Sequence, residues 1–187
     1  MLNEALLFLL NVILQSFAGI LLLRFHLQWL RAPLRNPVGV FVMTLTDFLV
    51  LRARRYVRSV WGYDSATFLL AWLVETIYLT CVMWLEGYLH GFPLVGLLAL
   101  AAVNLLSLSL YLLMGAVFVQ AILSWVNPYT PISAVLSAAT QPFLQPLRRI
   151  VPMVGNLDLT PMVLLILCQL TLIVPVAMLE GLVGRLF

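Results

Sequence analysis

The chain has 187 residues, of which 64% are hydrophobic and 9% charged, and its mean hydropathy is +1.10. An ordinary soluble domain carries about 25% charged residues, so this composition excludes a water-exposed globule. The net charge is +3, and all ten basic residues are arginines. Eight of them lie in two segments between apolar stretches, which favours membrane topology over nucleic-acid binding.

Four apolar stretches are long enough to cross a bilayer, which takes about 20 residues. They cover residues 3–30, 66–89, 99–126 and 158–183. The chain begins without a basic segment, and no small-residue cleavage site follows a short apolar core. We therefore expect the first stretch to be a retained span and not a signal peptide.

The sequence also repeats itself at a separation of 94 residues, which becomes 96 upstream of Pro37. Pairs related in this way are Gly19–Gly115, Trp29–Trp125, Pro37–Pro131, Thr46–Thr140, Arg54–Arg148, Arg55–Arg149 and Asp64–Asp158. A period this long indicates two copies of one folded unit. We predict an all-α membrane protein, a single membrane domain over residues 1–187, with repeat 1 at 3–89 and repeat 2 at 99–183.

Each repeat is expected to carry an interfacial amphipathic segment between its two spans. Residues 38–61 are apolar but end in arginines that fall within one arc of a helix, typical of a helix lying at the headgroups. Residues 132–150 have the same outline, but Pro142 and Pro146 leave open a division into two short pieces. Pro175 should kink the fourth span or leave a carbonyl unpaired.

The arginine distribution predicts the orientation. Basic loops stay on the cytoplasmic side, so both long loops are expected inside and both termini, with the connection at 90–98, outside. The two repeats then insert the same way up, as parallel tandem repeats about an axis along the membrane normal. We expect anionic phospholipid headgroups, or equally a cytoplasmic protein partner, to contact the arginine cluster Arg52, Arg54, Arg55, Arg58, Arg148 and Arg149.

Two charges lie inside the spans. Arg24 and Glu75 differ in depth by only about 5 Å at 1.5 Å of rise per residue. In repeat 2 their positions are Gln120 and Gln169, so both charges are replaced by amides. We expect an ion pair in repeat 1 and an amide pair in repeat 2, acting as contacts between helices; a proton- or ion-handling pair is the alternative.

A stripe of small and polar residues follows one face of the first span and the matching face of the third. Its members are Asn11, Gln15, Gly19, Asn104, Ser107 and Gly115. Such stripes usually mark close helix packing, so we expect the interface between the repeats here and rank a pore lining lower.

No nucleophile, nucleotide or metal motif of soluble enzymes is present. His26 and His90 have no carboxylate or cysteine at metal-ligand spacing, and Cys81 and Cys168 lie singly inside apolar stretches. The sequence predicts no catalytic, cofactor-binding or metal site, and no enzymatic activity.

Two linked motifs resemble a known family. The first runs through Gln28, Trp29, Pro33, Asn36, Pro37, Thr46, Asp47, Arg54, Arg55, Gly62 and Asp64. The second runs through Ser124, Trp125, Asn127, Pro128, Pro131, Thr140, Pro142, Pro146, Arg148, Arg149, Pro152, Gly155, Asp158 and Pro161. Together they resemble the two-repeat form of the YggT family of small integral membrane proteins. The chain departs from the family pattern at Phe48 and Arg52, where the family has prolines, and at Gln120 and Gln141, where it tends to a basic and an acidic residue.

The resemblance implies a multi-pass protein of the bacterial inner membrane without enzymatic activity. Relatives are linked to osmotic or ion homeostasis, to cell division and, in plastids, to assembly of membrane cytochrome complexes. Some relatives have one repeat, which implies that this chain is a fused dimer. We expect a non-enzymatic protein that supports osmotic-stress physiology or assembly of a membrane complex, with lipid, such a complex or a second copy of itself as partner. A small ion or proton transporter or channel component using Arg24 and Glu75 is the alternative.

Overall fold

The computed structural model describes residues 2–57, 63–87, 93–127, 130–151 and 158–186. Its helical elements are α1 (Leu2–Leu10), η1 (Asn11–Gln15), α2 (Ser16–Trp29), α3 (Pro37–Ala53), α4 (Ser65–Glu86), α5 (Leu94–Val126), α6 (Pro131–Arg148), α7 (Thr160–Thr171), η2 (Leu172–Val176) and α8 (Ala177–Leu186). The elements η1 and η2 are π-helical turns that continue the flanking α-helices.

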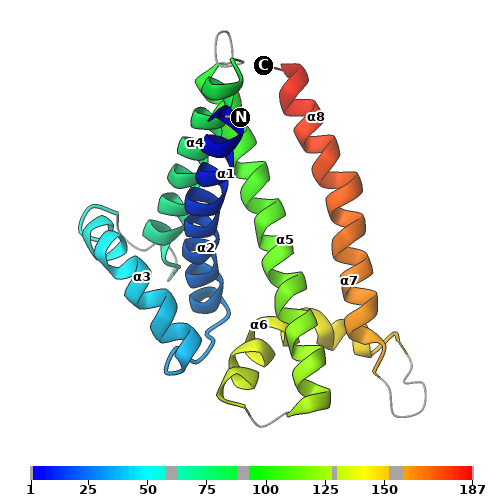
Figure 1. Ribbon diagram of the computed structural model, residues 1–187. Coiled ribbons are helices and arrows are strands. Elements are labelled where there is room, and N and C mark those ends of the chain that lie inside the picture. Colours follow the sequence, from blue (N-terminus) through cyan, green and yellow to red (C-terminus); the bar gives the residue numbers. More distant parts are fainter. Residues whose placement is uncertain (1, 58–62, 88–92, 128–129, 152–157, 187) are drawn as a thin grey trace.

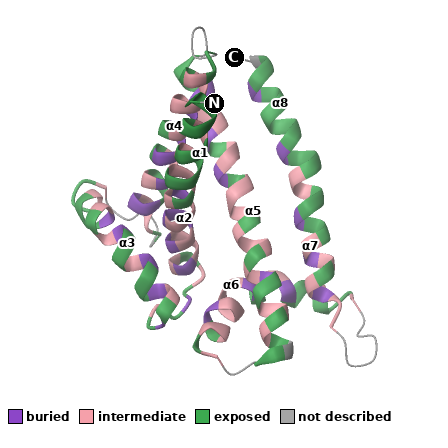
Figure 2. Ribbon diagram, in the orientation of Figure 1, coloured by how far each residue is buried: buried purple, intermediate pink, exposed green. Residues whose placement is uncertain are grey.

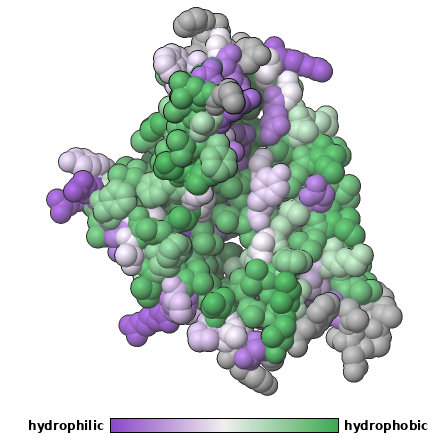
Figure 3. Space-filling view, viewed as in Figure 1, coloured by the Kyte–Doolittle hydropathy of each residue, from purple (hydrophilic) through white to green (hydrophobic). Residues whose placement is uncertain are grey.

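Four helices in the described residues are long and apolar enough to cross a membrane, as predicted. They are Leu2–Trp29, Ser65–Glu86, Leu94–Ser124 and Thr160–Arg185. The third begins at Leu94, before the predicted residue 99, with Pro93 in an extended conformation as its N-cap. The visible face of the molecule is largely apolar, with hydrophilic residues at its upper end, at its left and lower edges and in patches along the middle (Figure 3).

The two repeats run the same way up. Both chain ends and the end of α4 lie at one end of the molecule; α6 lies at the other end, and α3 begins there and rises obliquely beside α2 and α4 (Figure 1). Thus α1–α2 and α5 descend toward the interfacial helices, and α4 and α7–α8 return. This arrangement is that of parallel tandem repeats.

Local chemistry sets the start of α3. Asn36 is extended and its side chain accepts a hydrogen bond from the Gly39 backbone N–H at 3.0 Å, while Pro37 occupies the first turn. A Cβ on Gly39 would stand 2.2 Å from the Leu34 carbonyl oxygen, so only glycine fits. The helix then packs against both α2 and α4.

The interfacial segments differ from expectation in two ways. The helix α3 ends at Ala53, so Arg54 and Arg55 lie in the turn after it and not on its face, and Arg58 lies outside the described residues. The second segment is one helix, α6, that continues through Pro142 and Pro146. Both prolines are exposed, so the carbonyl groups that lose their helical hydrogen bond to a proline are not buried in the protein core.

Pro175 lies inside η2, the π-helical turn of the fourth span. A π-turn accommodates an extra residue, and proline supplies no N–H for the regular ladder, so the two features fit together. The first span carries its own π-turn, η1, where no proline occurs.

The buried core is concentrated in the first repeat and at its contact with α5. Its centre is a cluster of Ala18, Leu21, Leu22, Val50, Ala71, Val74 and Leu105. The second repeat has a smaller cluster of Val117, Leu144, Leu164 and Cys168. Purple buried positions are accordingly frequent on α2 and α4 and sparse on α8 (Figure 2).

Candidate functional site

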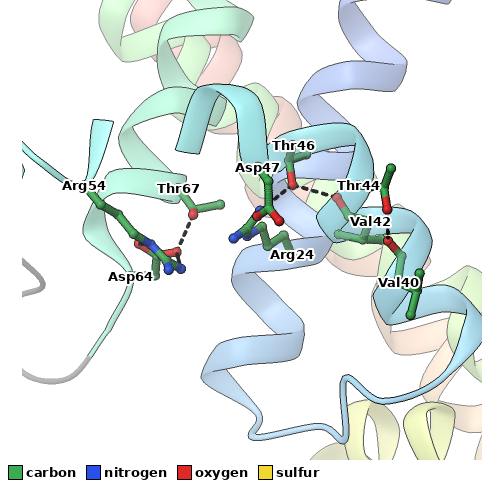
Figure 4. Close-up of polar contacts among 9 residues, drawn as sticks. All are labelled: Arg24, Val40, Val42, Thr44, Thr46, Asp47, Arg54, Asp64 and Thr67. Carbon is green, nitrogen blue, oxygen red and sulfur yellow. Dashed lines mark hydrogen bonds and ion pairs between the residues drawn. The ribbon is translucent and has the colours of Figure 1, made fainter. Parts of the chain in front are cut away.

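The polar residues of the spans form two separate networks, the first around Arg24. Arg24 Nη1 donates to Asp47 Oδ1 and to Thr46 Oγ1, each at 2.7 Å (Figure 4). The Arg24 side chain is 3% exposed and that of Asp47 is 42% exposed, so the pair joins a buried cation on α2 to a partly exposed carboxylate on α3. The contact fastens the interfacial helix to the first span.

The equivalent contact in repeat 2 is uncharged. Gln120 on α5 accepts a hydrogen bond from the Thr140 hydroxyl of α6 and donates to Ser137 Oγ at 3.4 Å. Thr140 is the counterpart of Thr46, so the same pair of elements is joined at the same position in both repeats.

The expected pairs Arg24–Glu75 and Gln120–Gln169 are therefore not formed. The partner of Arg24 lies on α3 and not on the second span, and Gln169 is exposed and bonds none of the residues that the structure describes. The sequence argument failed because Asp47 is also replaced by glutamine, at Gln141. Both Glu75 and Asp47 are replaced by glutamine in repeat 2, together with Arg24, so the replacement pattern alone could not separate the two candidate partners.

Glu75 is the centre of the second network. Its side chain is fully buried, and Oε1 accepts from Gln15 Nε2 at 3.2 Å and from Asn104 Nδ2 at 3.1 Å. Gln15 belongs to repeat 1 and Asn104 to repeat 2, so Glu75 joins the two repeats. Its second oxygen, Oε2, is buried without a hydrogen-bond partner.

The predicted polar stripe lies around this network. Asn11, Gln15, Asn104 and Ser107 line one pocket of about 400 Å³, which Tyr111 of α5 and Glu180 of α8 also line. A Cβ on Gly19 would lie 4.0 Å from Leu108 Cδ2, an ordinary van der Waals contact, and both residues line a second pocket, so α2 and α5 are not closely packed at that point. Gly115 is exposed, and a Cβ there would meet nothing within 4 Å.

Both repeats place an ion pair at the junction between the interfacial helix and the second span. Arg54 donates to Asp64 Oδ2 at 2.6 Å, and Arg148 to Asp158 Oδ2 at 3.0 Å. Thr67 also donates to Asp64 (Figure 4). In the amide orientation that satisfies both groups, Gln28 donates to Asp64 at 2.8 Å and accepts from Arg54 at 3.2 Å.

These contacts set the charge state of the junction. Burial alone would raise the pKa of Asp64, but hydrogen bonds from Arg54 and Thr67 outweigh it and leave that pKa below its ordinary value. The same balance, with hydrogen bonds from Thr160 and the charge of Arg148, lowers the pKa of Asp158. The hydrogen bond with Asp64 raises the pKa of the Arg54 guanidinium. Both carboxylates therefore stay ionised at neutral pH.

The remaining members of the arginine cluster lie at the surface. Arg52, Arg55 and Arg149 are exposed near the ends of α3 and α6. No group of three potential metal ligands occurs among the residues with described positions. His26 is bonded at Nδ1 to the Leu22 carbonyl oxygen, at 2.7 Å, and His90 lies outside the described ranges.

A family model described as CCB3/YggT matches residues 3–85 and 99–179, one match for each repeat. The chain belongs to the CCB3/YggT family. The two matches include every residue of the Arg24 and Glu75 networks, whereas Glu180 lies just beyond the second match.

Relatives of this chain match it over most of its length. "Uncharacterized protein YggT" of Escherichia coli K12 is 32% identical over 161 residues, which is 86% of this chain and 83% of the relative. "Uncharacterized protein PA0392" of Pseudomonas aeruginosa is 33% identical over 162 residues, 86% of this chain and 82% of the relative. An "Uncharacterized protein" of Haemophilus influenzae is 29% identical over 150 residues, 79% and 78% of the two chains. No solved structure matches this YggT-family chain.

Proposed function

We propose that this chain is a non-enzymatic scaffold of the bacterial inner membrane that supports osmotic-stress or ion homeostasis, or the assembly of a membrane complex. One observation carries the proposal. Glu75 has no exposed surface and is bound by amides of both repeats, so the intramembrane carboxylate acts in holding the two halves together.

The other polar contacts support the same reading. Arg24 joins α2 to α3, and Gln120 joins α5 to α6. In each repeat, an arginine–aspartate pair also joins the end of the interfacial helix to the start of the second span. Each of these contacts joins two helices, or the ends of two helices, that follow one another in the chain. They define a fixed platform at the end of the molecule that carries α3 and α6.

The orientation follows from the charges. Seven described arginines lie in the two segments that join the spans within each repeat: Arg31, Arg35, Arg52, Arg54, Arg55, Arg148 and Arg149. These segments contain α3 and α6, which lie toward the end of the molecule opposite the two chain ends (Figure 1). We propose that this end faces the cytoplasm and the termini face the periplasm. An alkaline phosphatase fused to the C-terminus should be active, and a green fluorescent protein fused there should stay dark. The opposite pattern would refute the orientation.

A second candidate function is a small proton or ion transporter. It is favoured by the unpaired Glu75 Oε2 and by the pocket lined by the two amides that bind Oε1. An unpaired buried carboxylate oxygen is costly and is common where ions or protons bind.

Ion flux in liposomes separates the two candidates. A scaffold gives no flux above protein-free liposomes, and Glu75→Gln keeps its stability because glutamine still presents an acceptor to Gln15 and Asn104. In cells lacking the native protein, Glu75→Gln should then restore growth after osmotic upshift as well as the native chain does. Flux that disappears in Glu75→Gln, with the variant failing to restore growth, would replace the scaffold by the transporter.

A further inference from the structure

The second repeat contains a pocket that the first repeat fills with its own side chains. The pocket is about 470 Å³ and lies among α5, α6 and α7, with Val117, Ala121 and Leu165 on its apolar wall. This volume is within the range of ligand sites, about 300–1,000 Å³. Gln120, Ser124, Arg148 and Asp158 also line it, so the pocket is apolar on one side and polar on the other.

Comparison of the repeats explains why the space exists. The counterpart of Ala121, 96 residues earlier, is Phe25. Its ring lies 5.3 Å from that of Phe68, which is the counterpart of Met162. Two aromatic rings therefore occupy in repeat 1 the region that an alanine and a flexible methionine border in repeat 2.

The polar residues at the edge of the pocket also leave more space in repeat 2 than in repeat 1. In repeat 1 the Gln28 amide lies against the Arg54–Asp64 pair. Its counterpart is Ser124, which is too short to cover the corresponding pair. Arg148 uses Nε and Nη2 on Asp158, its Nη1 bonds no described residue, and its side chain is 49% exposed. A guanidinium edge and a serine hydroxyl are left to bind a ligand.

These groups suit a phosphate ester. Guanidinium and hydroxyl donors bind phosphate oxygens, and guanidinium matches phosphate geometry. The local charge is also positive, because Arg148 and Arg149 outnumber Asp158. Residues of α6 and of the C-terminal part of α5 line the pocket, so it is at the end of the spans next to α6. Figure 1 shows α6 at the end of the molecule opposite the two chain ends. Phosphate on the rim and hydrocarbon on the wall are the two parts of a membrane lipid.

We propose that the pocket of repeat 2 binds one anionic phospholipid, with its phosphate at Arg148 and Ser124 and one acyl chain against Val117, Ala121 and Leu165. The site goes beyond the scaffold role, because a lipid can be retained whether or not the chain supports osmotic tolerance. It also distinguishes the repeats, since Phe25 and Gln28 close the equivalent position in repeat 1.

The test fills the pocket with the residue that repeat 1 uses there. The native protein, Ala121→Phe and the matched control Ile122→Phe are purified in mild detergent, delipidated and titrated with phosphatidylglycerol or phosphatidylethanolamine. Native mass spectrometry then counts bound lipids. Ile122 is 43% exposed on the neighbouring side of α5, so the control adds the same ring outside the pocket.

The native chain and Ile122→Phe should each hold one phosphatidylglycerol, and Ala121→Phe should bind it about tenfold more weakly or not at all. Arg148→Gln should weaken binding about tenfold, as expected for loss of one charge-assisted hydrogen bond, and should remove the preference over phosphatidylethanolamine. If Ala121→Phe does not elute as a folded protein, Ser124→Gln, which copies Gln28, takes its place. Equal binding by the native chain and the pocket-filling variant would overturn the proposal, as would equal binding of the two lipids by the native chain.

Discussion

The Arg24–Asp47 pair gives a sharp test, because the second repeat supplies the replacement residues. Asp47→Gln leaves the Arg24 guanidinium, 3% exposed, without its counter-ion. Removing one partner of a fully buried pair costs about 3–5 kcal/mol, and the 42% exposure of Asp47 reduces the expected loss to about 2 kcal/mol. Arg24→Gln removes the buried charge itself and lets Asp47 face water, so its cost should be smaller, about 1 kcal/mol.

The double variant Arg24→Gln with Asp47→Gln copies the arrangement of Gln120 and Gln141 in repeat 2. The loss of stability in the double variant should be smaller than the sum of the losses in the two single variants. The difference, which is the coupling energy of the pair, should be about 1–2 kcal/mol. The free energy of unfolding is measured by denaturing-detergent titration of the protein in mild micelles. The control cycle is Arg24→Gln with Glu75→Gln, which should be additive within about 0.5 kcal/mol because the two residues share no partner. Coupling in the control cycle and none between Arg24 and Asp47 would refute the assignment of partners.

Three further predictions follow from the junctions and the packing. The pKa values of Asp64 and Asp158 are lowered in the folded chain, so their ion pairs stabilise the fold above the ordinary carboxyl pKa of 3.8. This contribution is lost as the pH falls through the lower pKa values of the folded chain. The thermal midpoint of the native chain should therefore drop below about pH 4, and it should drop less in the double variant Asp64→Asn with Asp158→Asn. A midpoint equally pH-dependent in both would contradict this. Gly39→Ala should lose about 1–3 kcal/mol to the clash with the Leu34 carbonyl, whereas Gly115→Ala should be neutral or slightly stabilising; equal thermal shifts would argue against the cause given. The double variant Phe25→Ala with Gln28→Ser, which copies Ala121 and Ser124, should open the repeat 1 position and raise bound phosphatidylglycerol from one to two per chain in native mass spectrometry; a count that stays at one would contradict the role given to these two residues.

Composition and periodicity predicted most of the fold. Hydropathy located the four spans, and the recurrence of Arg54–Asp64 as Arg148–Asp158 indicated two equivalent repeats. Both signals depend on many residues, so single exceptions do not hide them. Helix ends were less accurate, as at Ala53 and Leu94, because they depend on local capping and turn geometry.

The polar contacts could be predicted only in part. Depth along the spans placed Arg24 near Glu75, but a residue on an interfacial helix, Asp47, was available at shorter range. Depth in the membrane was estimated only for residues on the spanning helices, so a partner on α3 was not considered. The stripe argument located Gln15 and Asn104 between the repeats, while their common partner Glu75 was assigned elsewhere. Only the folded chain shows that the two polar features meet.

Glu75 has a counterpart, Gln169, that bonds nothing in the described part of the chain, so the two halves are no longer interchangeable. In an assembly of two identical one-repeat chains, symmetry would bring a second acid into an equivalent membrane position and double the cost of its desolvation. Because the two repeats are joined in one chain, they need not have the same residue at this position. Repeat 1 has the acid Glu75 at the contact between the repeats, whereas repeat 2 has Gln169, so the two repeats can differ in function.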